Sequence, residues 1–159
     1  EGNSSKGLLT DEGLDAYAFN ASYTGDSFGA SFSYSDNENA LSTFTTYAIN
    51  AFFAPDLDNF PSISAGFESG HIDALPSSGD NTSHYFLGLQ WDELGNGTLG
   101  AAIGTRSPKL ENGNEELMYE AFYSYNYADG ITITPLIYVK ESNSSDDETG
   151  LVLKTSFSF

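Results

Sequence analysis

The chain contains no cysteine in its 159 residues, and it has only 5 Lys and Arg against 23 Asp and Glu. The absence of cysteine excludes a disulfide framework and a zinc–thiolate site. The formal net charge of −18 excludes a nucleic-acid partner, because phosphates need a basic surface. The same charge argues against a general polybasic attraction to anionic lipid headgroups.

Long hydrophobic runs are also missing. No apolar segment approaches the roughly 18 to 20 residues that a membrane-spanning helix needs, which excludes a helical membrane protein. A transmembrane β-barrel is not excluded, because its strands give only a weak, alternating signal. Aromatic residues, in contrast, are abundant: the chain has 12 Phe, 10 Tyr and 1 Trp.

Apolar and polar residues alternate with the period of two that is typical of β-strands. In "SFGASFSYS", Phe28, Phe32 and Tyr34 share one face with Ala30, while serine and glycine occupy the other. No helical pattern is evident. We expect an all-β, antiparallel, up-and-down transmembrane β-barrel portion that covers residues 1–159 as one unit. The expected strands are 14–24, 27–35, 43–53, 61–69, 83–92, 98–106, 116–128, 131–141 and 149–159.

The connections between these segments are expected to alternate in length. The longer ones are 36–42, 70–82, 107–115 and 142–149, and the shorter ones are 25–26, 54–60, 93–97 and 128–130. Long loops at one end and tight turns at the other are typical of outer-membrane barrels. One Pro lies inside a strand, and since Pro cannot donate to the ladder, we expect a β-bulge at Pro135.

Aromatic residues are predicted to form two bands, as amphipathic rings do at membrane interfaces. The band at the short-turn rim would contain Tyr23, Phe28, Phe53, Trp91, Tyr127, Phe157 and Phe159. The band at the long-loop rim would contain Tyr17, Tyr34, Tyr47, Tyr85 and Tyr119. The terminal Phe would then be solvated by lipid rather than exposed to water.

Charged residues within strands lie on the face opposite the aromatic residues. These pore-lining candidates are Glu68, Arg106, Glu120, Lys140 and Lys154. Fixed charges in a pore bias which ions enter. An alternative of equal weight is that they pair with one another and hydrate the wall. With acidic loops at the mouth and three basic residues on the wall, we expect at most a mild cation preference.

Two segments near the C-terminus carry a resemblance to a known family. "HYFLGLQWDELGNGTLGAAIG", followed by "MYEAFYSYNYADGITITPLIYVKE", resembles the last strands of cyanobacterial outer-membrane porins of the OprB-like carbohydrate-selective group. The closing strand, with Phe157 and Phe159, is similar to the terminal strand of bacterial outer-membrane barrels. The resemblance covers about 83–159, and residues 43–67 fit less specifically.

The resemblance implies a porin of the bacterial outer membrane with a role in ion transport and carbohydrate transport. Its partners would be outer-membrane lipid and small solutes or ions, a homotrimeric assembly stays open, and no cofactor is implied. Two other functions stay open. One is a non-transporting barrel that acts as an adhesin or structural anchor, and the other is a secreted soluble β-protein that binds a ligand.

Neither an enzyme nor a metal protein is predicted. His71, Asp73, Asp80 and His84 flank one loop, but their spacing matches no compact metal motif, so we interpret them as solvated loop residues. Nothing in the pattern orients a Ser-His-Asp triad. We therefore expect no catalytic residue and no metal ligand.

The strand count leads to one more expectation. An odd number of strands, with the first and last running in the same direction, cannot form a single-chain barrel with an even strand number. We therefore expect the chain to be the C-terminal part of a larger barrel, of about sixteen strands, with an odd number of strands upstream.

Overall fold

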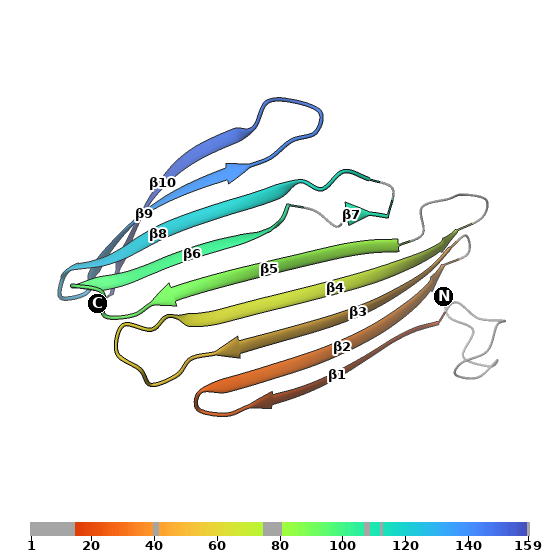
Figure 1. The fold of residues 1–159 in the computed structure, drawn as a ribbon, viewed down its shortest axis with the longest axis horizontal. Helices are drawn as coiled ribbons and strands as arrows, with labels where there is room; N and C mark the ends of the chain where they lie inside the picture. The colour runs from red at the N-terminus through yellow and green to blue at the C-terminus, as the bar shows by residue number, and fades with distance from the viewer. Residues whose placement is uncertain (1–14, 40–41, 75–80, 107–108, 112, 159) are drawn as a thin grey trace.

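The computed structural model describes residues 15–39, 42–74, 81–106, 109–111 and 113–158 (Figure 1). These residues form one antiparallel sheet of ten strands, which confirms the predicted all-β, up-and-down fold. The strands are β1 (Ala16–Thr24), β2 (Phe28–Asn39), β3 (Ser42–Phe53), β4 (Ser62–Ala74), β5 (Asn81–Trp91), β6 (Gly97–Thr105), β7 (Lys109–Leu110), β8 (Leu117–Ala128), β9 (Ile131–Lys140) and β10 (Glu148–Phe157). The part of the chain described here contains no helix that could cross a membrane.

The sheet is a single layer, and each long strand lies beside the one that precedes it in the chain (Figure 1). The order is β1-β2-β3-β4-β5-β6-β8-β9-β10, and only the short β7 lies off this path, paired with β5. No second layer of described residues covers either face (Figure 1). Among the described residues, the sheet is therefore held together mainly by contacts between neighbouring strands.

The registers place like residues together across the whole sheet. Phe32 pairs with Ile49, which pairs with Phe67 on the next strand. Further along, Phe67 pairs with Tyr85. Because side chains alternate along each strand, this register puts most of the large apolar residues of the nine long strands on one face. We call this the apolar face, and we call the opposite one, which is rich in Ser, Thr, Asn and Gly, the polar face.

Neither face provides a hydrophobic core. Among the described residues no apolar side chain is buried. Large side chains on the apolar face stay exposed, including Ile49 at 56%, Phe67 at 51% and Leu151 at 78%. A water-soluble domain of this size normally buries its apolar face against a second layer. The sheet therefore presents an apolar surface that something outside the described chain must cover.

The long strands begin within two residues of the predicted positions, but two of them extend further than predicted. Residues 36–39 and 70–74, expected in loops, continue β2 and β4. The connection at 40–41 is consequently short, whereas 54–61 at the opposite end is longer than its counterparts there. The predicted alternation of long and short connections is therefore wrong for the first part of the sheet. Residues 36–39 are polar on both faces and carry no alternation, and in the extension of β4 the apolar Ile72 lies on the polar face, so the pattern could not reveal either extension.

Two local features also differ from the prediction. The register of β8 and β9 shifts between Asn126 and Ala128, so the β-bulge lies near Tyr127 and not at Pro135, which stays in register opposite Leu153. The bulge sits next to the tight turn, where Gly130 has a φ of 70° that a side chain would strain. A bulge of this kind at the end of a hairpin leaves no period-two signature in the sequence.

The sheet is open at both sides within the described residues. β1 pairs only with β2, and β10 pairs only with β9, so the two strands do not pair with each other. They lie at opposite margins of the sheet (Figure 1). Each margin presents a row of backbone N–H and C=O groups without a strand partner. The predicted upstream strands would supply such partners, and they stay a prediction.

Candidate functional site

The polar face is the candidate functional surface, because it carries the charged strand residues that the sequence singled out. The registers place Glu68 opposite His84, Glu120 opposite Ala102, and Lys154 opposite Thr134. All these positions have the parity of the polar face. The residues around them are mostly small, and direct hydrogen bonds join some across strands, as from Asn20 Nδ2 to Ser33 Oγ at 2.7 Å.

Two of the three basic candidates are neutralised by acidic partners. Arg106 Nη1 lies 3.6 Å from Glu116 Oε2 and donates a hydrogen bond to the Glu141 backbone carbonyl at 3.1 Å. Lys140 Nζ lies 3.2 Å from Glu148 Oε1 and 4.6 Å from the centre of the Tyr138 ring. Both pairs lie at the end of the sheet where β6, β8 and β9 meet the connections at 106–116 and 141–147.

The remaining charged candidates are not paired. Glu68, Glu120 and Lys154 form no ion pair with any described residue. His84 is the register partner of Glu68, but its Nε2 donates a hydrogen bond to the backbone carbonyl of Thr105 at 2.8 Å. This ring nitrogen is therefore not available to Glu68. The candidates thus divide into two compensated cations near one end and three uncompensated charges along the strands. They do not converge on one point.

Aromatic rings cover glycines on the polar face, a feature that the sequence analysis missed. Phe52 pairs with Gly29, Phe86 with Gly66, Phe122 with Gly100, and Tyr138 with Gly150. A Cβ atom added at any of these four glycines would collide with the ring of its partner. Each ring therefore lies flat over the backbone of the neighbouring strand. A bulky side chain is in this way kept close to the wall instead of projecting from it.

These ring–glycine pairs also shape a hollow on the polar face. It has a volume of about 280 Å³ and lies over β1 to β5, with Phe52, Phe86, Asn50, Ser31 and Ser64 among its lining residues. The alternation of apolar and polar residues could not predict this hollow, because each Phe on the polar face breaks that alternation. Only the register reveals that each such Phe faces a glycine.

Aromatic residues predicted for the two bands lie on the apolar face, toward its two ends, and their role at a membrane interface stays a prediction. At the long-loop end, the ring centres of Tyr17 and Tyr34 are 5.9 Å apart, and those of Tyr34 and Tyr47 are 5.0 Å apart. At the opposite end, Tyr23 and Phe28 lie 6.1 Å apart, and Phe28 pairs with Phe53. Trp91, Tyr127 and Phe157 end their strands at this same end, and Phe159 lies outside the described residues.

Tyrosines at the long-loop end bond to carboxylates. Tyr85 Oη donates to Glu115 Oε1 at 2.9 Å, and Tyr119 Oη donates to Glu141 Oε1 at 3.0 Å. Tyr34 Oη lies 3.5 Å from Asp36 Oδ2, which also accepts from Thr45 Oγ1 at 2.7 Å. A ring with an apolar body and a hydrogen-bonded polar tip suits a boundary between hydrocarbon and water. The opposite end has more Phe and fewer such bonds.

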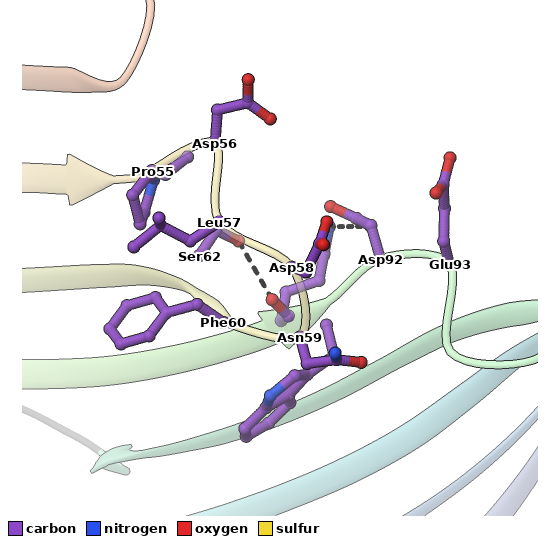
Figure 2. A pocket seen from close by; sticks show the side chains of 12 residues that line it. Pro55, Asp56, Leu57, Asp58, Asn59, Phe60, Ser62, Asp92 and Glu93 are labelled. Carbon is purple, nitrogen blue, oxygen red and sulfur yellow. Dashed lines mark hydrogen bonds between the residues drawn. The ribbon is translucent and has the colours of Figure 1, made fainter.

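Another hollow lies outside both faces, at the short-turn end. It has a volume of about 490 Å³ and is formed by the connection at 54–61 together with the turn that follows β5 (Figure 2). Asp56 and Glu93 lie on opposite sides of it, and Asp92 accepts a hydrogen bond from Gln90 Nε2 at 3.0 Å (Figure 2). The described residues contain no group of three or more side chains placed to hold a metal ion.

The four residues that the sequence analysis interpreted as solvated loop residues, His71, Asp73, Asp80 and His84, have separate surroundings where the structure describes them. His71 Nδ1 contacts Asn81 Oδ1 at 2.9 Å, while His84 bonds to Thr105, and Asp80 lies outside the described residues. The candidate site is thus a surface with distributed charge, which can orient water and ions. No protein-family model, no curated protein and no solved structure matches this chain. The likeness to the OprB-like group therefore stays a resemblance of sequence alone.

Proposed function

We propose that this chain forms part of the wall of a water-filled pore across a bacterial outer membrane. In this proposal the apolar face contacts lipid and the polar face lines the pore. Small hydrophilic solutes and inorganic ions diffuse through it passively. Diffusion requires no catalytic residue, which is consistent with charges that are spread along the wall.

The observation that carries the proposal is the continuous apolar face without a core. Nine long strands present apolar side chains on one side, and no described apolar side chain is buried. Water would be a poor solvent for that face, whereas lipid removes the cost of exposing it. The long strands contain 9 to 13 residues, and a tilted strand of about 9–11 residues crosses the hydrocarbon core.

The composition of the polar face favours a pore over a filled lumen. Many of its residues are small, such as Ser, Thr, Asn and Gly, and the larger rings of Phe52, Phe86 and Phe122 lie flat over glycines. Flat rings and small side chains leave the space in front of the wall to water. A barrel that served only as an anchor would not need small side chains and flat rings on its inner face.

The test is single-channel recording of the purified full-length protein in a planar lipid bilayer. We expect discrete current steps whose conductance rises in proportion to salt concentration, because ions in a wide aqueous pore move as in bulk solution. The same protein unfolded by heat is the control and should give no steps. Flotation with vesicles, measured in parallel, reports whether the protein has entered the membrane.

Two results would contradict the proposal. Protein that floats with vesicles but gives no current steps would be a non-transporting barrel. Protein that stays dispersed and monomeric in buffer without detergent would be a soluble β-protein, and its apolar face would then be covered by something other than lipid.

A further inference from the structure

The wall charges can be counted from the structure. The chain has 5 basic side chains. Lys6 lies outside the described residues, and Lys109 lies in β7 opposite Ser83, with the parity of the apolar face. Arg106, Lys140 and Lys154 are thus the described basic residues of the polar face.

Two of these three cations do not act as isolated charges. Glu116 lies 3.6 Å from Arg106, and Glu148 lies 3.2 Å from Lys140. An ion close to either pair meets opposite charges at nearly the same distance, so their effects on the ion largely cancel. The pairs are too exposed to contribute much stability, with side chains 40% and 23% exposed in one and 31% and 55% exposed in the other. The cancellation of charge does not depend on that stability.

On the polar face of the described strands, the uncompensated charges are two carboxylates and one ammonium. Glu68 in β4 and Glu120 in β8 have no basic partner among the described residues, and Lys154 in β10 has no acidic one. Glu120 pairs in register with Ala102 and Tyr138, and Glu68 with Ala48 and His84. Small or uncharged neighbours leave both carboxylates to act on ions in front of the wall.

We propose, on the basis of the proposed pore, that Glu68 and Glu120 determine its ionic preference and make the wall itself cation-selective. The ion pairs of Arg106 and Lys140 remove the opposition that the sequence alone predicts from these two residues. Small inorganic cations such as K⁺ are concentrated beside the two carboxylates, and anions are depleted there. The carboxylates of the wall and the acidic loops at the mouth then both favour cations over anions.

The size of the effect follows from Coulomb attraction in water. A unit charge about 7 Å from an ion, screened by about 0.1 M salt, raises the local concentration of a monovalent cation less than two-fold and lowers that of an anion by a similar factor. Removing one carboxylate should therefore reduce the ratio of K⁺ to Cl⁻ permeability about two-fold. Raising the salt to about 1 M should abolish most of the difference, because the screening length falls to about 3 Å.

The experiment measures reversal potentials of the full-length protein in a KCl gradient across a planar bilayer. We expect a cation-selective wild type, with lower selectivity in Glu68→Gln and Glu120→Gln. Lys154→Gln should raise the selectivity. Glu93→Gln, which removes the same charge from an exposed turn at the short-turn end, is the matched control and should change it less than either wall variant.

The ion pairs allow a sharper test. Glu116→Gln leaves the charge of Arg106 uncompensated and should lower cation selectivity, whereas the double variant Arg106→Gln/Glu116→Gln should restore the wild-type ratio. Unchanged selectivity in Glu68→Gln and Glu120→Gln, or a double variant that resembles Glu116→Gln, would overturn the inference while the pore itself remained. A complete absence of conductance would instead contradict the proposed pore, and this inference with it.

Discussion

Replacing Gly100 by Ala should destabilise the sheet, although Ala normally suits a strand better than Gly. Gly100 pairs with Phe122, and an added Cβ would collide with three carbon atoms of that ring. Without a collision the substitution would gain about 0.5–1 kcal/mol, because Gly loses more conformational freedom on folding. Overpacking typically costs about 1–3 kcal/mol. We therefore expect a net loss of about 1–2 kcal/mol.

A double-mutant cycle separates the collision from other effects. In a Phe122→Ala background the ring is gone, so Gly100→Ala should be neutral or stabilising by up to about 1 kcal/mol. The coupling between the two positions should then be about 1–3 kcal/mol, which is within the range for residues in direct contact. The assay is equilibrium unfolding in urea of the protein folded in lipid vesicles, followed by the far-UV circular dichroism of the sheet.

Gly88→Ala provides the matched control. The nearest atom to its added Cβ would be Ser64 Oγ, at 2.7 Å, and this hydroxyl can rotate away. We expect no destabilisation there. Equal losses in Gly88→Ala and Gly100→Ala, or a loss in Gly100→Ala that persists without the Phe122 ring, would refute the idea that rings lie flat on glycines to shape the wall.

Three further changes have defined outcomes. Ile49→Lys, between the two aromatic bands of the apolar face, should cost about 2–4 kcal/mol in lipid, whereas Asn50→Lys on the polar face should cost less than about 1 kcal/mol; unfolding in vesicles measures both. Tyr119→Phe removes the 3.0 Å hydrogen bond to Glu141 and should lower the unfolding free energy by about 0.5–1.5 kcal/mol in the same assay. The double variant Lys140→Gln/Glu148→Gln should change it by less than about 1 kcal/mol, because the pair is largely exposed.

The alternation of apolar and polar residues was sufficient to predict the strands and their faces. In the strand that contains Phe28 and Tyr34, every second side chain is apolar, and the observed register places those residues beside the apolar residues of β3. A parity error would have moved the whole set to the other face. The aromatic bands were predictable for the same reason, because position along a strand and parity together fix a place on the sheet.

The parts that sequence reasoning missed depend on which residues are paired. Gly100 and Phe122 are separate in the chain, and nothing local indicates that one ring covers that glycine. The pattern also could not show whether the charged strand residues act on ions or pair with one another. In the structure Arg106 and Lys140 are paired, but their partners are Glu116 and Glu148 and not the other candidates. The strand ends beyond the apolar band, such as residues 36–39, are polar on both faces and therefore resembled loops.

The most direct test of the account asks which face of the sheet meets water in the membrane. Ser64 and Ala65 are neighbours in β4 on opposite faces, and the chain has no native cysteine, so Ser64→Cys and Ala65→Cys each introduce one thiol. A charged, water-soluble thiol reagent, applied while single-channel current is recorded, should reduce the conductance of Ser64→Cys and leave that of Ala65→Cys unchanged. Reaction at Ala65→Cys with protection of Ser64→Cys would contradict the assignment of the apolar face to lipid and the polar face to the pore.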